Sequence, residues 1–408
     1  MSAPVAAAMT RGARAADPAV PQPAPKLYDE WCRKNIPDLS HRVIVVTGAN
    51  AGLGFWATRA FVNAGATVVM ACRSPERGEA ARKAILGDVR RQERRGTMAG
   101  GEPEARMVVM ECDLASFASV RAFAAAFLGD ARFDRLDVLC CNAGVAALAK
   151  RKTADGFDVQ FQTNHLGHFL LTALLFERLR ATAAVVEGDS IKDPSTGMGF
   201  DADVRVVHHS AWKAHQAAGI NFQNTDDGRS TFCGGLFNAG TPCAPLCCGT
   251  MAPWTRYGQS KLANLLFAYE LQRKCAGSNV KSVAAHPGDA STNLQKNAAE
   301  AGGWAGCLGG NCNSGPCACF GWKFFNAHYA QSALDGALPL IMACVGPSVD
   351  GGAFVGPERK DTDGPPGLRR SSKASHDAAA AAKLWAFSEE AVGQTFAVDV
   401  TPLDSDGE

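Results

Sequence analysis

Two side chains four residues apart, Tyr257 and Lys261, have the types and the spacing needed for proton transfer. They lie in the segment TRYGQSKLANLLFAYEL, whose apolar pattern predicts a helix with both side chains on one face. A phenol is a poor proton donor or acceptor near neutral pH, and a neighbouring ammonium group is expected to lower its pKa. Such a pair can exchange a proton with a carbonyl or an alcohol while a hydride moves to or from a nicotinamide.

A glycine-rich turn lies far upstream of this pair. The segment VIVVTGANAGLGFWATRAF places Gly48, Gly52 and Gly54 between a predicted strand and a predicted helix. A side chain at these positions would hold the backbone away from a pyrophosphate, which amide groups and a helix N-terminus attract. This context is typical of a dinucleotide-binding turn, with a plain flexible turn as the alternative.

The residues after the second predicted strand indicate which dinucleotide is bound. A site for NAD usually has a carboxylate there for the ribose 2′-hydroxyl, whereas a 2′-phosphate needs a cation. Here Cys72 is neutral and Arg73 supplies a cation whose planar donors suit a phosphate. The sequence therefore favours NADP(H) over NAD(H), with a solvated surface arginine as the alternative.

Alternating β-branched runs and helical patterns begin at residue 43, and they must position these groups. The predicted strands are 43–46, 67–71, 107–111, 136–140, 204–209 and 280–286, and the predicted helices are 55–63, 76–95, 116–127, 157–180 and 257–274. This alternation predicts one doubly wound α/β domain of the Rossmann type, a parallel sheet with helices on both faces.

The domain is expected to span residues 39–398, between a disordered or targeting tail at 1–38 and a tail at 399–408. Stretches rich in Gly, Pro, Cys or Asn are expected to be loop insertions: 96–106, 221–255 and 300–326. The second and third emerge on the substrate side of the sheet, where long loops often cover a ligand. The third loop has aromatic residues that either cap an apolar substrate or anchor the loop: Trp304, Phe320, Trp322, Phe324, Phe325 and Tyr329.

Composition limits the partners. With 41 basic and 40 acidic residues the chain has no field that would gather nucleic acid or an anionic membrane, and no apolar run reaches the roughly 20 residues of a membrane span. A small molecule with a carbonyl or hydroxyl group is therefore the expected partner. The chain is expected in the cytoplasm, with a chloroplast or mitochondrial location as the alternative because the first sixteen residues are rich in Ala and contain Arg but no acid.

The cysteines and histidines do not have the spacing of a metal site. Cys72, Cys140 and Cys141 lie in apolar runs and are expected to act as small buried hydrophobes. His165 and His168 are expected to pack, because a third ligand is missing. Two further clusters lack C-x2-C spacing, so incidental thiols are expected, with redox pairs or a metal as alternatives: Cys233, Cys243, Cys247 and Cys248, and Cys307, Cys312, Cys317 and Cys319.

Taken in order, the motifs resemble those of the short-chain dehydrogenase/reductase family. They are TGANAGLG, ECDLAS, CNAGV, FQTNHLGHFLLT, YGQSK and HPGDAST, and the resemblance runs from IPDLSHRVIVVTGAN to KLWAFSEEAVG. Within the family, NHLGHFLLT and SKLANLLFAYEL are most similar to the branch of retinol dehydrogenases, WW-domain oxidoreductase and protochlorophyllide reductase. That branch favours NADP(H).

The resemblance implies roles for individual residues. Tyr257 would be the acid/base, Lys261 would bind the nicotinamide ribose, and Asn164 would hold a helix kink and a water that links Lys261 to solvent. Asp113 would bond the adenine and Thr292 would touch the nicotinamide end. The other expected cofactor-binding residues are Gly48, Asn50, Gly52, Leu53, Gly54, Arg73, Leu114, Asn142, Ala143, Gly144, Pro287 and Gly288. Relatives often pair through the helices that carry Asn164 and Tyr257, so a homodimer is expected.

The segment RVVHHSAWKAH departs from the family's pattern. The fifth strand of the family commonly ends NVSS or NHSS, and the second serine orients the substrate carbonyl. Here Ser210 aligns with the first serine and Ala211 with the second. Losing that donor would cost on the order of 10²–10³ in rate. A one-residue bulge would bring Ser210 into the pocket, where it would replace the missing catalytic hydroxyl. Alternatively, serine or threonine hydroxyls of the inserted loop would replace it. His208 and His209 are expected to be structural, with a proton carrier as the alternative.

Three functions follow from these patterns. The first is an NADP(H)-dependent oxidoreductase acting on a carbonyl or alcohol of an apolar substrate. The second is a nucleotide-binding scaffold or redox sensor with weakened catalysis, because Ala211 replaces the expected serine. The third is a protein that uses its cysteine clusters for a metal or a disulfide.

Overall fold

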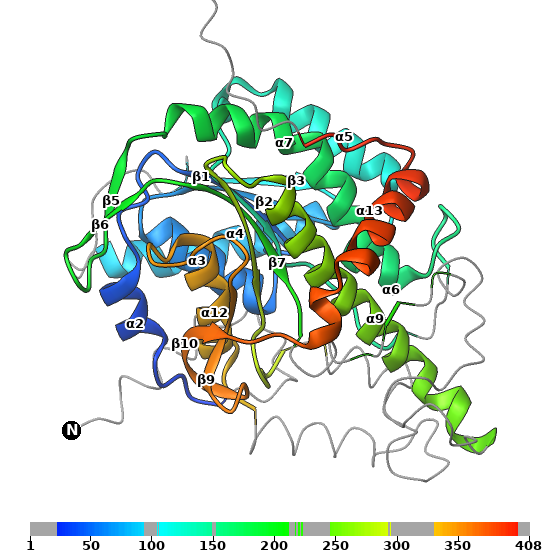
Figure 1. The fold of residues 1–408 in the computed structure, drawn as a ribbon. Helices are drawn as coiled ribbons and strands as arrows, with labels where there is room; N and C mark the ends of the chain where they lie inside the picture. The colour runs from blue at the N-terminus through cyan, green and yellow to red at the C-terminus, as the bar shows by residue number, and fades with distance from the viewer. Residues whose placement is uncertain are drawn as a thin grey trace, which may run out of the picture.

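The computed structural model describes residues 23–93, 104, 106–148, 152–211, 217, 219–220, 222, 245–292, 294 and 330–398. Within these ranges an eight-stranded sheet, in the order β10-β9-β8-β7-β4-β1-β2-β3, runs through the molecule with helices on both sides (Figure 1). All neighbouring pairs are parallel except β9 and β10 at one edge. The doubly wound parallel fold is confirmed.

Six strands of the sheet are the predicted ones: β1 (Val43–Thr47), β2 (Thr67–Cys72), β3 (Met107–Glu111), β4 (Val138–Cys141), β7 (Val204–His209) and β8 (Val280–Ala285). The pattern did not predict β9 (Phe354–Arg359) and the edge strand β10 (Asp363–Arg369), or the separate hairpin of β5 (Ser190–Lys192) and β6 (Gly199–Asp201). Proline and glycine hide both strands in the sequence. They are tolerated because β10 lies at the edge of the sheet and because Pro357 of β9 lies beyond Phe354 and Val355, the residues that pair with β8.

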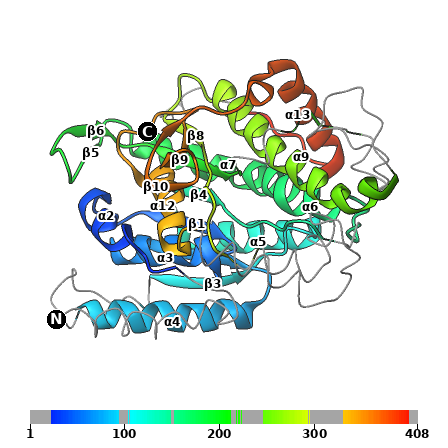
Figure 2. The same ribbon diagram turned by 90° about the horizontal axis from the view of Figure 1, so that it is seen from below.

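The helices divide between the two faces of the sheet. One face is covered by α2 (Tyr28–Asn35), α3 (Gly52–Asn63), α4 (Pro75–Glu93) and α12 (Ala333–Val345). The other is covered by α5 (Phe117–Gly129), α6 (Val159–Phe161), α7 (Gly167–Val185), α9 (Pro245–Lys274) and α13 (Ala378–Val392). Figure 2 shows α4 on the opposite side of the sheet from α9 and α13. Short turns complete the order: η2 (Ala131–Phe133), η3 (Gln162–Leu166) and η5 (Lys373–His376).

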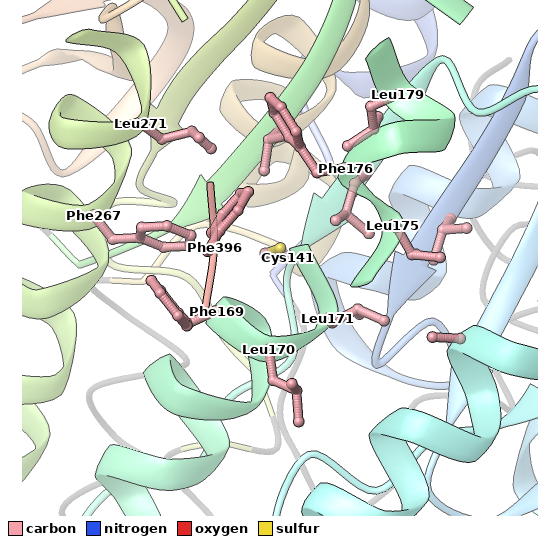
Figure 3. Packing of buried hydrophobic residues seen from close by; sticks show 14 of the residues in the cluster. Cys141, Phe169, Leu170, Leu171, Leu175, Phe176, Leu179, Phe267, Leu271 and Phe396 are labelled. Atoms are coloured by element: carbon pink, nitrogen blue, oxygen red, sulfur yellow. The ribbon is translucent and has the colours of Figure 1, made fainter. Parts of the chain in front are cut away.

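The inner strands β1, β2, β4, β7 and β8 are buried on both faces, so their apolar side chains fill two cores. In β1, Val43 and Val45 join the core beneath α7 and α9, while Ile44 and Val46 join the core beneath α3 and α12. This alternation explains why the strand is a continuous apolar run in the sequence. Figure 3 shows the first core, where side chains of α7 and α9 meet Phe396 from the end of the chain.

The structure differs from two expected boundaries. Residues 23–38 were assigned to the disordered or targeting tail, and they include α2, while the Asp335 carboxylate accepts the backbone N–H groups of Lys26, Leu27 and Tyr28. That contact spans more than 300 positions, so no local pattern signals it. The expected insertion 221–255 ends too late, because α9 already begins at Pro245. Among the described residues, no helix has the length and apolar character to cross a membrane.

Candidate active site

The predicted site residues gather at the carboxyl edge of the sheet. The glycine turn follows β1, Arg73 follows β2, Asp113 and Leu114 follow β3, and the segment from Asn142 to Gly144 follows β4. The segment with Pro287, Gly288 and Thr292 follows β8. This edge is where ligands bind in open parallel sheets.

The glycine turn packs directly against the segment after β4. Gly48 has φ +66°, and a Cβ built on it would lie 3.1 Å from the Cα of Ala143. A Cβ on Gly54 would lie 2.4 Å from Nδ2 of Asn142 and 2.6 Å from the Gly48 carbonyl oxygen. Only glycine fits both positions, so the turn packs tightly against the segment after β4 and leads directly into the N-terminus of α3, where a pyrophosphate is attracted.

Hydrogen bonds fix the ends of β1 and β4 to each other. The Thr47 hydroxyl oxygen accepts the N–H groups of Asn142 and Ala143, both at 2.9 Å, and the Asn142 side chain donates to the Thr47 carbonyl at 2.8 Å. Oγ1 of Thr47 also lies 2.9 Å from Nε2 of His168. The Nδ1 of His168 lies 3.0 Å from the Asn164 carbonyl oxygen, so this network continues to the predicted catalytic asparagine.

Arg73 lies exposed directly after β2, and within the described part of the chain it pairs with no carboxylate. The preceding Cys72 thiol is buried, and it faces the backbone N–H groups of Ala49 and Asn50 in the glycine turn. Burial raises the pKa of that thiol to about 12. Cys72 is therefore a neutral packing residue, as are the buried Cys140 and Cys141, while Arg73 is an available cation beside the turn.

Asn164 lies in the π-helical turn η3, which interrupts the predicted helix 157–180 at the expected kink. Its Oδ1 accepts the Val145 N–H at 2.8 Å, and its Nδ2 donates to the Val145 carbonyl at 2.9 Å and to Oγ of Ser260 at 2.8 Å. Ser260 donates in turn to the Tyr257 carbonyl at 2.7 Å. One side chain therefore links the segment after β4 to the turn of α9 that carries Tyr257.

Tyr257 and Lys261 lie together on α9, with Nζ of Lys261 5.8 Å from the centre of the phenol ring. Burial lowers the pKa of the Lys261 ammonium to about 8 and raises the pKa of the Tyr257 phenol. The prediction that the Lys261 ammonium lowers the pKa of the Tyr257 phenol was wrong for the protein without ligands. Nζ of Lys261 instead donates to the His209 carbonyl at 2.8 Å, and burial is the cause that raises the pKa of the phenol.

Ser210, the expected substitute donor, has a hydrogen-bond partner inside the protein. Its hydroxyl donates to the Lys261 carbonyl at 2.8 Å, and the side chain is buried. The pairing of β7 with β8 is continuous through His209, so the expected alternative of a bulge is not present in the strand. In this arrangement the one proton of the hydroxyl joins the end of β7 to α9.

The four histidines near the site are buried and neutral. Burial lowers the pKa of His168 to about 4, lowers those of His165 and His208 to about 3, and lowers that of His209 well below its usual range. His165 bonds Oγ of Ser388 at 2.8 Å, and Nδ1 of His209 lies 3.0 Å from Oδ1 of Asn142. These contacts fit the expected structural role better than a proton carrier.

Sequence reasoning missed one ion pair beside the site. Arg256, which precedes Tyr257, pairs with Asp158 through a short contact, and their side chains are 6% and 2% exposed. The two residues are 98 positions apart, and no motif connects them. The predicted cysteine clusters and the aromatic residues of the third loop lie outside the residues whose side chains are described.

The known proteins that are similar to this chain belong to one family. A family described as short chain dehydrogenase matches residues 42–191. Mouse retinol dehydrogenase 14 is 33% identical over 364 residues, which are 88% of each chain. Human retinol dehydrogenase 14 is 37% identical over 266 residues, which are 63% of this chain and 65% of that protein, slightly less than two thirds of its length.

A solved structure agrees with the sequence relatives. The crystal structure of an uncharacterised protein from Mycobacterium paratuberculosis is 33% identical, has a TM-score of 0.57, and covers 89% of this chain and 98% of its own. The motifs at the sheet edge, the fold and these relatives lead to one conclusion. The chain belongs to the short-chain dehydrogenase/reductase family of oxidoreductases.

Proposed function

We propose that this chain is an NADP(H)-dependent oxidoreductase that acts on a carbonyl or hydroxyl group of an apolar small molecule, with Tyr257 as acid/base. The observation that carries the proposal is the hydrogen-bonded link from Val145 through Asn164 and Ser260 to the Tyr257 turn. It joins the cofactor side of the site to the proton donor. The names of the retinol dehydrogenase relatives support an alcohol or aldehyde on an apolar chain as the substrate.

The residues present fit a dinucleotide. Gly48 and Gly54 let the glycine turn pack against Asn142 and Ala143, and a Cβ on Gly144 would lie 3.2 Å from Oδ1 of Asn164 and 3.3 Å from Nζ of Lys261. The glycine turn would hold the pyrophosphate, Arg73 a 2′-phosphate, and Asp113 the adenine end. A nicotinamide bound there supplies or accepts the hydride.

The side chains of the site handle the proton. The Tyr257 phenol, whose pKa burial raises, is protonated at neutral pH and can donate to the oxygen of a carbonyl that accepts a hydride. Lys261 remains an ammonium below about pH 8 and stabilises the negative charge that the phenol acquires as its proton leaves. Asn164 keeps the two elements in register.

The test is NADPH oxidation over a panel of aldehydes, ketones, retinoids and steroids. We expect Tyr257→Phe to lower kcat by about 10²–10⁴, the usual contribution of a positioned acid, while NADPH binding measured by fluorescence is retained. Turnover that is insensitive to this substitution would contradict the assignment of Tyr257.

The cofactor preference has a separate test. Because a hydrogen bond to a charged group contributes about 1.5–3 kcal/mol, Arg73→Ser should weaken NADPH binding by roughly 10- to 100-fold. NADH binding should change little, since NADH has no 2′-phosphate. Equal losses for both cofactors would show that Arg73 does not contact the phosphate.

One observation favours the second function, a nucleotide-binding scaffold with weak catalysis. Ser210 is bonded to the Lys261 carbonyl and Ala211 has no hydroxyl, so the end of β7 offers no side-chain donor to a substrate oxygen from these two positions. In this case NADPH would bind normally while the whole substrate panel stays near the background rate. A homodimer, predicted from the family, is tested by the mass of the protein in solution.

A further inference from the structure

The loop that follows β4, Asn142–Leu148, has a strained conformation. Ala147 is fully buried and has φ +51°, which lies in the left-handed region that an alanine rarely adopts. Such conformations persist only where neighbouring contacts hold them, and they are concentrated at functional sites. The same loop begins with the residues that line the proposed cofactor site, so its shape bears directly on the nicotinamide end.

Side chains from three places hold this loop. Asn164 bonds both the N–H and the carbonyl of Val145, as described above. Oε1 of Gln160 accepts the Ala147 N–H at 2.7 Å, which fixes the strained residue itself. Nη2 of Arg256 donates to the Leu148 carbonyl at 3.1 Å and closes the loop from the side of α9.

The Arg256 guanidinium is held by Asp158. Nη1 of Arg256 bonds Oδ2 of Asp158, while Oδ1 accepts the N–H groups of Gln160 at 3.0 Å and Phe161 at 2.9 Å. A buried carboxylate thus caps α6 and anchors the arginine at the same time. Because Arg256 directly precedes Tyr257, this pair joins the strained loop, the start of the π-helical segment and the Tyr257 turn at one point.

We propose that Arg256, anchored by Asp158, is a positioning residue that keeps the strained loop and the Tyr257 turn in register for hydride and proton transfer. The proposal rests on the proposed function for its consequence but not for its geometry. A buried pair is weak evidence for net stability, because desolvation offsets the attraction between its charges. A positioning role explains why the charges are retained directly beside Tyr257.

The test uses the double variant Arg256→Met/Asp158→Asn in the full chain. Methionine fills similar space, and asparagine keeps an acceptor for the α6 cap without leaving a buried unpaired charge. Without the hydrogen bond to the Leu148 carbonyl, the backbone of Ala147 should leave its left-handed conformation more often. We expect hydrogen exchange of the peptide 142–148, measured without cofactor, to become about tenfold faster, a factor that follows from the usual penalty of left-handed alanine. NADPH affinity should fall by a similar factor.

Adding Ala147→Gly provides the rescue. Glycine adopts positive φ without a Cβ penalty, so the triple variant should regain slow exchange and NADPH affinity although Arg256 is absent. A purely structural role for the ion pair would not respond to glycine at this one position. The matched control is the distant buried pair, Arg205→Met/Asp203→Asn, which should lower the melting temperature without changing exchange in 142–148.

The outcomes separate the two proposals. Unchanged exchange in the double variant, or no recovery in the triple variant, overturns the positioning role of Arg256. Faster exchange with recovery supports it even if the wild-type protein binds no NADPH, and in that case the proposed function fails on its own. Where the wild type binds and turns over, the double variant should also show a lower kcat at saturating NADPH, and Arg256→Lys should recover part of it.

Discussion

Both ends of β7 have buried charge, but only one end balances it. At the amino end the Asp203 carboxylate accepts Nε and Nη2 of Arg205 at 2.6 and 2.9 Å, and Nζ of Lys281 lies 3.0 Å away. At the carboxyl end the Lys261 ammonium donates to the His209 carbonyl at 2.8 Å. No carboxylate of the described residues pairs with it.

The pKa values differ accordingly. Burial alone would raise the pKa of the Asp203 carboxyl, but the neighbouring Arg205 and Lys281 outweigh it, so that pKa is lowered and the charge is kept. Burial without a counterion instead lowers the pKa of Lys261 to about 8. The amino end keeps its charge, whereas burial moves the pKa of Lys261 towards neutral pH, a perturbation that is typical of functional sites.

Asp203→Ala should give the largest effect, because it leaves the buried Arg205 guanidinium without its carboxylate and leaves Lys281 with only Asp350, 3.9 Å away. We expect the free energy of unfolding to fall by about 3–5 kcal/mol in a urea titration, with NADPH affinity unchanged. A loss of affinity without a loss of stability would show that the amino end is not merely structural, and the contrast between the two ends would fail.

Ala211→Ser tests the carboxyl end. If the site lacks only the oxyanion donor, the serine should raise kcat by roughly 10²–10³ on the best carbonyl substrate of the panel, with little change in NADPH affinity. Ser210→Ala is the control: it removes the bond to the Lys261 carbonyl and should leave the rate of the Ala211→Ser protein within the same range. No gain from serine at position 211 would mean that another group of the protein already supplies the donor.

The two ends were not equally predictable from the sequence. The carboxyl end was accessible because Tyr257, Lys261 and Asn164 belong to motifs whose chemistry fixes residue type and spacing. At the amino end Asp203 lies directly before β7 and Arg205 is two residues further along, a spacing that places two side chains on one face of an extended chain but carries no chemistry. Arg256 could not be linked to Asp158, because that contact depends on how α9 packs against α6.

The fold shows the same limit. Five of the six predicted strands, β1, β2, β4, β7 and β8, lie inside the sheet, where burial on both faces demands continuous apolar runs. β9 and β10 contain Pro357, Pro365 and Pro366, residues that usually exclude a strand. They are tolerated here because β10 lies at the edge and because Pro357 lies beyond the residues of β9 that pair with β8. Helix α12 likewise contains Pro339. Local rules predict strands with continuous apolar runs well, including β3 at the other edge, and predict elements that contain proline poorly.

Lys261→Met is the finest test of the difference between the two ends, because it should raise the free energy of unfolding and lower turnover. The folded-state pKa of about 8 lies below the ordinary value of 10.5, so between these values the unfolded chain binds more protons and stability rises with pH. At pH 7 the lysine therefore costs the fold up to about 3 kcal/mol. Removing it should stabilise the protein at pH 7 by up to that amount and flatten the stability profile between pH 8 and 10.5.

The same variant should lose turnover, while the His209 carbonyl keeps a partner in Nδ2 of Asn264, which donates at 3.0 Å. Lys281→Met at the amino end is the matched control. It takes a counterion from Asp203, so urea unfolding at pH 7 should show a loss of stability where Lys261→Met shows a gain. Two lysine substitutions with the same sign of effect would mean that the ends of β7 are electrostatically alike, and the assignment of Lys261 as a functional charge would then lose its physical basis.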